Sequence, residues 1–87
     1  MKQLAQLQVK VITPQQTIFE GHTNAVTSVN SAGRFDILPR HSQFITIIQQ
    51  YLILAPPANQ TLKIDSGVIY CHQNQVEIYI TPASINH

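Results

Sequence analysis

The residues best suited to chemistry lie in one short segment, GRFDILPRHSQF, at residues 33–44. It holds two arginines, an aspartate and a histidine around Pro39, whereas charged residues make up only 10% of the whole chain. Such a cluster could form a catalytic pocket, a metal site or a loop that binds a partner. The rest of the chain narrows this choice.

The sequence gives little support for a metal site or a nucleophilic cysteine. Cys71 and His72 are adjacent, so on a strand they point to opposite faces and cannot chelate one ion together. Cys71 follows Ile69 and Tyr70, which favours a small buried side chain over an activated thiolate. A metal site built from histidines distant in the sequence stays open as the weaker alternative. The histidines are His22, His41, His72 and His87.

Nucleotide binding and hydrolysis are equally poorly supported. A phosphate-binding loop needs closely spaced glycines so that backbone N–H groups can approach the oxygens. A paired-carboxylate hydrolase needs two acids in one cleft, and so small a chain leaves little room for that cleft. We therefore expect no free-standing enzyme and no cofactor. The glycines are Gly21, Gly33 and Gly67, and the acids are Glu20, Asp36, Asp65 and Glu77.

Composition indicates a single domain, residues 1–87, that lies against other proteins. Hydrophobic residues are 44% of the chain, enough for one core. Few charges mean a surface of Gln, Asn, Ser and Thr, which is less costly to desolvate than an ionic surface. A soluble domain that is merely rich in glutamine is the alternative. The net charge of +1 is too small for a nucleic-acid partner.

Three further features favour a cytoplasmic protein. Cys71 is the only cysteine, so no intrachain disulfide can form and a reducing compartment fits best. No apolar run approaches the ~20 residues of a membrane-spanning helix. The N-terminus, MKQLAQLQVKV, alternates polar and apolar residues and lacks the apolar region of a signal peptide.

A hydrophobic period of two predicts an all-β fold. Leu7, Val9 and Val11 alternate with polar residues near the N-terminus, and Val76, Ile78 and Ile80 do so near the C-terminus. Between these ends lie β-rich runs separated by turn signals, at residues 17–23, 25–30, 35–38, 44–48, 51–55, 61–64 and 67–72. Residues 45–54 are apolar enough for a short helix, but their Ile, Thr and Tyr favour strands. We expect a compact, flattened β-sandwich or barrel of about nine to ten short strands.

In this strand pattern, segment 33–44 begins with a turn at Gly33, continues as a strand over residues 35–38 and then forms a loop at the rim of the sheet. Pro39 ends a strand because it has no N–H to donate to the ladder. Arg40 and His41 then lie on a connection before Phe44 begins the next strand. Polar loops on a stiff β scaffold present contacts to partners.

The order of these segments resembles the N-terminal β-sandwich of the epsilon subunit of rotary F-type ATP synthases. That family carries patterns of the kind V-x-T-P, F-x-G, G-x-F-G-I-L-P-x-H-x-P and S-G-G, then a final V-x-I/V strand. The likeness runs from about residue 7 to residue 81. Matching positions are Val11, Thr13, Pro14, Phe19, Gly21, Gly33, Phe35, Ile37, Leu38, Pro39, His41, Ser66, Gly67 and Val76.

The chain departs from the family pattern at several positions. Asp36 stands in place of a glycine, Gln43 in place of a proline, and Val68 in place of the second glycine of S-G-G. Gln50 and Tyr51 replace a Pro-Gly turn, so the middle hairpin is expected to differ. The family continues into a C-terminal helical hairpin, whereas this sequence stops after a strand core at about residues 4–81 and a tail at 82–87. Either this branch lacks the hairpin or the sequence is cut at the domain boundary, so in the chain as given we expect no hairpin.

The resemblance implies a non-catalytic rotor subunit of a proton- or sodium-translocating ATP synthase. It would link the gamma subunit to the ring of c subunits at the cytoplasmic face of the membrane, and it would reach the membrane only through the complex. Position-for-position likeness assigns Asn30, Ser31, Gly33 and Arg34 to the c-ring contact, and Thr13 and His41 to the gamma contact. The alternative is a stand-alone β-sandwich that binds a ligand or peptide on an exposed edge.

Overall fold

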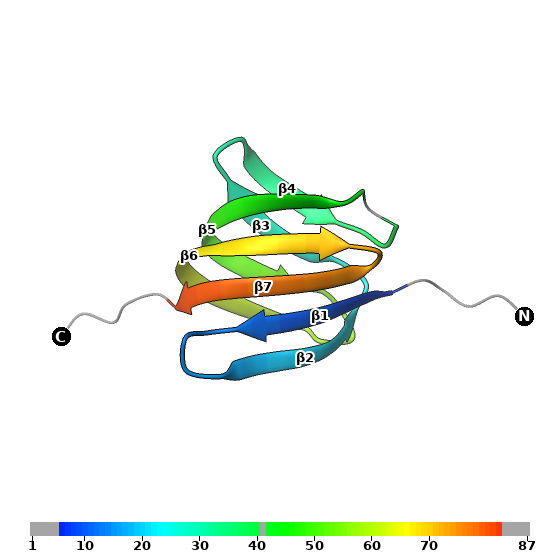
Figure 1. Ribbon diagram of the computed structural model, residues 1–87, viewed down its shortest axis with the longest axis horizontal. Helices are drawn as coiled ribbons and strands as arrows, with labels where there is room; N and C mark the ends of the chain where they lie inside the picture. The colour runs from blue at the N-terminus through cyan, green and yellow to red at the C-terminus, as the bar shows by residue number, and fades with distance from the viewer. Residues whose placement is uncertain (1–5, 41, 83–87) are drawn as a thin grey trace, which may run out of the picture.

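The computed structural model describes residues 6–40 and 42–82, and it places seven β-strands in this part of the chain. They form one hydrogen-bonded sheet in the order β2-β1-β7-β6-β5-β3-β4 (Figure 1). Only β1 and β7 pair in parallel; the other neighbours are antiparallel. No helix in this part of the chain has the length and hydrophobicity needed to cross a bilayer. The strands are β1 (Leu7–Ile12), β2 (Thr17–Thr23), β3 (Val26–Asn30), β4 (Gly33–Ile37), β5 (Phe44–Leu54), β6 (Gln60–His72) and β7 (Gln75–Pro82).

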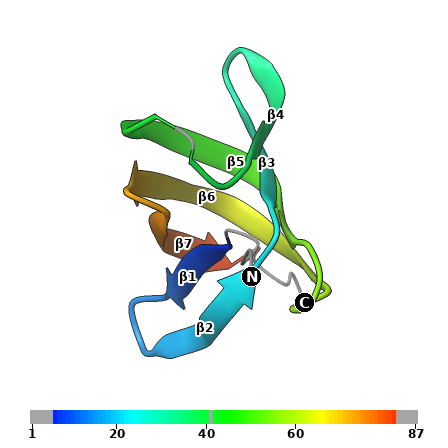
Figure 2. The same cartoon turned by 90° about the vertical axis from the view of Figure 1, so that its right-hand side faces the viewer.

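The sheet folds over itself into two layers because its two longest strands bend. The pairing of β5 with β6 shifts register between Gln49 and Gln50, and the pairing of β6 with β7 shifts between Ile64 and Ser66. At such a shift one strand has one more residue than its partner, which breaks the ladder locally and bends that strand. As a result, β3 and the far part of β5 lie behind the layer of β6, β7 and β1 (Figures 1 and 2). This is the flattened sandwich that the sequence predicts.

The all-β fold is confirmed, but the expected number of nine to ten strands is wrong. Two pairs of separate runs, 44–48 with 51–55 and 61–64 with 67–72, are continuous strands in the structure. Gln50, with a positive φ of 75°, lies in a bulge of β5 and not in a turn, because the pairing with β3 passes from Leu52 directly to Gln49. A bulge interrupts the hydrophobic alternation as a turn does, although pairing continues on both sides of it. The last strand also reaches Pro82, which the sequence assigned to the tail; the rest of that tail lies outside the described residues.

The core lies where the alternation on β1 and β7 predicts it. Gln6 and Gln8 are exposed and Lys10 is half-buried, while the apolar residues between them are fully buried. Each buried aliphatic side chain contributes about 1.5–3 kcal/mol relative to an exposed one. The core residues are Leu7, Val9, Val11, Val26, Ile37, Ile48, Leu52, Leu54, Ile64, Ile69, Cys71, Val76, Ile78 and Ile80.

A buried threonine ties the end of β2 to the loop that follows β5. The Thr23 hydroxyl lies 2.9 Å from the Ala25 carbonyl oxygen and 2.7 Å from the Ala55 carbonyl oxygen. Two backbone bonds reinforce this junction, from Asn24 N–H to Pro56 and from Ala55 N–H to Ala25. A hydroxyl has one proton to donate, so the two carbonyls share it. The contact joins segments 32 residues apart.

Replacing Thr23 with valine is expected to lower the free energy of unfolding by about 1 kcal/mol, because the shape is kept and a buried hydrogen bond is lost. Urea denaturation followed by circular dichroism measures this. Thr17→Val is the matched control, since Thr17 is exposed on the same strand, and it should change stability by less than about 0.5 kcal/mol. Equal effects at the two positions would show that the Thr23 hydroxyl contributes nothing specific.

Candidate protein interface

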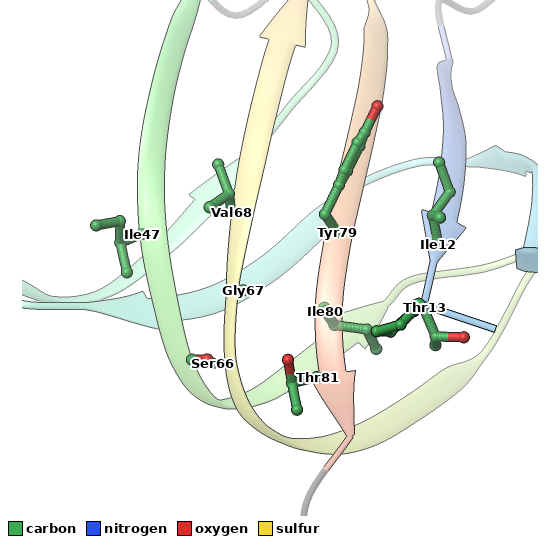
Figure 3. Close-up of a pocket in the computed structure, with 10 residues that line it drawn as sticks. Ile12, Thr13, Ile47, Ser66, Gly67, Val68, Tyr79, Ile80 and Thr81 are labelled. Atoms are coloured by element: carbon green, nitrogen blue, oxygen red, sulfur yellow. The ribbon is translucent and has the colours of Figure 1, made fainter. Parts of the chain in front are cut away.

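The outer face of the layer formed by β6, β7, β1 and the first half of β5 carries a row of apolar side chains that are exposed, except for one that is half-buried. Cross-strand partners project from the same face of a sheet. Ile47 on β5 pairs with Val68 on β6, which pairs with Tyr79 on β7, which pairs with Ile12 on β1. Ile47 is 71% exposed, so this row is not part of the core. We call these four residues the apolar row (Figure 3).

The next row shows where the apolar surface ends. Ile45 pairs with Tyr70, Tyr70 with Glu77, Glu77 with Lys10, and Lys10 with Glu20. The side chains therefore change from apolar on β5 and β6 to charged on β7, β1 and β2. Together the two rows give a contiguous apolar area over β5, β6 and the near side of β7. Exposed apolar areas of this kind mark binding surfaces for other proteins.

Two hollows flank the ridge formed by Ile47 and Val68. The first, of about 500 Å³, lies toward β7 and the β1–β2 turn (Figure 3). The second, of about 690 Å³, lies toward the β3–β4 turn. Besides the shared ridge, the first is lined by Ile12, Thr13, Pro14, Ser66, Gly67, Tyr79, Ile80 and Thr81, and the second by Ser31, Ile45, Thr46 and Gln49. Neither lining contains a charged side chain, so both hollows suit apolar anchors of a partner.

Tyr79 holds its ring along the apolar row through a bond on its own strand. Its hydroxyl donates to Glu77 Oε1 at 2.9 Å. This hydrogen bond raises the pKa of Tyr79, with smaller contributions from desolvation and from the Glu77 charge. Tyr79 thus exposes the apolar face of its ring while its hydroxyl is already hydrogen-bonded to Glu77, an arrangement that suits a protein interface.

The turn predicted to contact the c ring lies beside the second hollow. Asn30 pairs with Gly33 across a two-residue turn, and Asn30 Oδ1 accepts a bond from Ala32 N–H. Asn30 Nδ2 also donates to Thr46 Oγ1 at 3.2 Å, which ties the turn to β5. Ser31 lines the hollow itself. The structure therefore brings Ser31 to the apolar surface, with Gly33 and Arg34 exposed at the tip. Asn30 is directed instead to Thr46, whose cross-strand partner Ile69 is buried.

Thr13, assigned to the gamma contact, is buried and uses its hydroxyl within the β1–β2 turn. Thr13 Oγ1 donates to the Gln16 carbonyl at 3.0 Å and accepts from the N–H groups of Gln15 and Gln16. Thr13 also lies in the wall of the first hollow. The Thr13 hydroxyl thus fixes the turn beside that hollow and is not free for a partner.

His41 lies outside the described residues, but its neighbour Arg40 shows where this loop is anchored. Arg40 has a positive φ of 68°, and its N–H donates to Asn74 Oδ1 in the turn between β6 and β7. That turn lies at the end of the molecule opposite to the β3–β4 turn (Figure 1). Residues 33–40 therefore run from one end of the sandwich to the other, and Thr13 and Arg40 lie at opposite ends.

Asp36 occupies an ordinary strand position, although the family pattern has glycine there. It pairs with Thr27 on β3, and its carboxylate accepts a hydrogen bond from the Thr27 hydroxyl. Its backbone is not among the described positions with positive φ. No glycine conformation is needed, so the substitution is accommodated by a cross-strand bond.

The apolar row was missed in the sequence because alternation was read only for the buried face. Residues 44–48, FITII, carry apolar side chains on both faces: Ile48 is buried, whereas Ile45 and Ile47 are exposed. The available signal was a run with apolar side chains on both faces, at Ile45, Ile47 and Ile48, on a strand with one wet face.

Cys71 is a buried core residue, as the sequence predicts. Its side chain is fully buried on β6, and burial raises the pKa of the thiol above its ordinary value of 9.0. The neutral thiol is therefore favoured in the folded state. This stabilising contribution is fully present below about pH 9 and is lost as the pH rises through the folded-state value, because the unfolded chain ionises first.

We expect Cys71 in the native chain to react with a disulfide reagent at least about a hundredfold more slowly than in concentrated urea, since a buried thiol must await opening of the structure. The release of the reagent chromophore measures both rates. A Gln75→Cys variant, with an added thiol at an exposed position of β7, should gain one rapidly reacting thiol. Fast labelling of the unmodified native chain would show that the Cys71 thiol is accessible in the folded protein.

Comparison with known proteins gives consistent matches. Residues 6–84 match the family described as ATP synthase, Delta/Epsilon chain, beta-sandwich domain. The ATP synthase epsilon chain of Rickettsia typhi is 33% identical over 85 residues, covering 92% of this chain and 76% of that protein. The epsilon chain of Nitratiruptor sp. is 25% identical over 80 residues, covering 88% of this chain and 62% of its own length.

Solved structures show the same fold at low sequence identity. A chain in the Euglena gracilis mitochondrial ATP synthase OSCP/F1/c-ring structure superposes with a TM-score of 0.80 at 16% identity, covering 97% of this chain and 56% of that chain. A chain in the Tetrahymena thermophila ATP synthase central stalk/c-ring structure gives a TM-score of 0.73 at 13% identity, with 86% and 63% covered. The domain thus spans roughly half to three quarters of the length of these proteins.

Proposed function

Because the chain belongs to the family of ATP synthase delta and epsilon chains that carry this β-sandwich domain, we propose that it is a non-catalytic subunit of the central stalk. Residues 1–87 form one β-sandwich domain that binds the gamma subunit and rests on the c ring. The subunit helps to couple ion flow through the ring to ATP synthesis and hydrolysis. It lies at the cytoplasmic face of the membrane and is held there by the complex.

The observation that carries this proposal is a continuous surface with two differently built parts. The apolar row and its two hollows form a broad face that suits a large protein partner. The β3–β4 turn projects at one end of that face and is fixed to β5 by the bond from Asn30 to Thr46. We assign the broad face to gamma and the turn to the c ring.

The architecture fits a mechanical role. Torque transfer needs a body that does not deform between its two contacts, and two packed layers of one sheet provide such stiffness. The strands β5 and β6 each run through both layers, so the layers are joined covalently as well as by packing. The hollows are lined by aliphatic side chains together with uncharged polar ones, a lining that suits the binding of a partner's apolar groups.

Site-directed cross-linking in the assembled complex tests this assignment. The native Cys71 is buried, so a single surface cysteine can be labelled selectively. A photoreactive cross-linker on Ser31→Cys should reach the c subunit, and one on Tyr70→Cys should reach gamma. Thr61→Cys, exposed on the first half of β6, is the control and should give neither product. Failure of the chain to co-purify with gamma and the ring would favour the stand-alone binding module instead.

A further inference from the structure

Strand β2 forms an open edge of the sheet. In the part of the chain that the structure describes, it stands last in the strand order and pairs with β1 alone (Figures 1 and 2). The backbone N–H and C=O groups on the far side of an edge strand can pair with a further strand. No residue of β2 lines either hollow or belongs to the apolar row, and β4 lies at the other end of the strand order. This edge is therefore separate from the face assigned to gamma and from the β3–β4 turn.

The regular part of this edge is centred on Gly21. The register of β1 with β2 shifts at Ile18, just beyond the pair of Phe19 with Val11. The ladder is therefore regular over residues 19–23 and irregular before them. When an edge strand pairs antiparallel with its own copy, the two-fold axis is perpendicular to the sheet, and residues of the outer face stand opposite residues of the outer face. Residues 19–23 match their own copy when Gly21 lies on that axis.

The polar side chains on the outer face of β2 favour this register. Glu20 and His22 are both exposed, and with Gly21 on the axis each Glu20 faces His22 of the other copy. The carboxylate would accept a hydrogen bond from the imidazole there, while Lys10, its cross-strand partner on β1, lies on its other side. With Glu20 on the axis instead, two carboxylates would face each other, which is destabilising. The edge is thus complementary to itself in one register.

The inner face of β2 fits the same register. Phe19 is half-buried, and its ring lies over Gly21, where a Cβ would be 3.2 Å from Phe19 Cζ. With Gly21 opposite its own copy, no side chain stands between the two strands at the axis. The two Phe19 rings, one from each copy, would then approach each other over the glycine pair and bury apolar area that one copy leaves exposed.

We propose that the β2 edge binds a second copy of this chain as an antiparallel strand pair centred on Gly21. The sheets of the two copies then join into one sheet across the two-fold axis. Two pairs of Glu20 with His22, one on each side of the axis, set the register, whereas an unrelated edge strand offers no such match. The interface is short and falls at the weak end of specific contacts, so the dissociation constant should be on the order of 10–100 µM. The proposal does not rest on the assignment to the central stalk, since it uses neither the apolar row nor the β3–β4 turn.

Sedimentation equilibrium of the purified chain between about 5 and 500 µM measures this association, a range that brackets the expected dissociation constant. His22→Glu should raise that constant at least about tenfold, because a carboxylate at position 22 then faces Glu20 of the other copy. Gln75→Glu is the matched control: it adds the same charge in the same cross-strand row, two strands from the edge, and should change the constant less than about twofold. The exchange Glu20→His with His22→Glu restores the opposite partners and should return the constant to within about threefold of the original.

Urea midpoints show that these variants are folded. A chain that stays monomeric at every concentration would overturn the proposal and leave the edge to a strand of another protein. Equal effects of His22→Glu and Gln75→Glu, or an exchange variant that associates no better than His22→Glu, would overturn it as well, because the association would then not depend on the pairing of Glu20 with His22.

Mixed disulfides test the register independently of charge. A mixture of Glu20→Cys and His22→Cys chains should form cross-linked dimers faster than either chain links to itself. Opposite positions have Cβ atoms about 4.5–5.5 Å apart, whereas the diagonal positions that each chain offers to its own copy are about 7–8 Å apart. The native Cys71 is buried and does not compete. Equal or faster linking within one kind of chain would mean that Gly21 does not lie on the axis, and the proposed pairing would be wrong.

Discussion

Replacing Gly67 with alanine will destabilise this domain by about 3 kcal/mol, a large fraction of the stability of so small a protein. A Cβ at this position would lie 2.6 Å from the Tyr79 carbonyl oxygen and 2.9 Å from Ile80 Cγ2. The first of these atoms belongs to the backbone of β7, so it cannot rotate away. Alanine must therefore push β6 and β7 apart beside the bulge, where β6 passes between the two layers.

Urea denaturation measures the effect, and Gly21→Ala provides the matched control. A Cβ at Gly21 would meet only the Phe19 ring, at 3.2 Å, and a side chain on the edge strand can adjust. We expect Gly21→Ala to cost less than about 1 kcal/mol. With a slope of about 1 kcal/mol/M, the Gly67 variant should lose about 3 M in its midpoint. A midpoint shift no larger than that of Gly21→Ala would mean that β6 and β7 are not packed as closely as described.

The same geometry explains why the neighbouring position tolerates a larger residue. Val68 replaces the second glycine of the S-G-G pattern, but its side chain lies on the outer face and is 39% exposed. Only the first glycine of that pattern, Gly67, faces a backbone atom of the neighbouring strand, the Tyr79 carbonyl oxygen. The substitution adds a branched side chain to the ridge between the two hollows, so it alters the proposed interface and not the core.

The second large effect concerns that ridge. Replacing Ile47 and Val68 together with glutamate should weaken association with gamma more than about a hundredfold, since each change removes apolar contact and buries a charge without a partner. The fold should persist, because both side chains project from the outer face. Surface plasmon resonance with immobilised gamma subunit measures the affinity of the double variant and of the unmodified chain.

Thr61→Glu controls for added charge on the same strand. Thr61 is exposed and pairs with Ile53, on the half of β6 away from the ridge. The affinity of the Thr61→Glu variant for gamma should therefore lie within about twofold of that of the unmodified chain. Circular dichroism must show that all variants are folded. If the double variant binds as well as Thr61→Glu, gamma contacts some other face and the apolar row needs another partner.

Local patterning in the sequence was enough to predict the first and last strands of the chain, β1 and β7. On β1 and β7 the side chains alternate strictly, and a period of two can place only one set of residues in the core. The buried faces of these strands, and the burial of Cys71, therefore followed from residue order alone. Segment order along the chain was also enough to indicate the family, because matches in sequence order do not depend on the spatial arrangement.

What the tertiary structure decided is which distant residues are neighbours. No local signal distinguishes the bulge at Gln50 from a turn, so strands that bend through both layers were counted as separate strands. Nor does alternation reveal that Ile47, Val68, Tyr79 and Ile12 fall in one row, since that depends on the register of four strands. Thr13 was assigned to the gamma contact, yet its hydroxyl forms hydrogen bonds within its own turn. Periodicity fixes the face on which a side chain lies, whereas pairing register and bulges, which are long-range properties, assemble those faces into a surface.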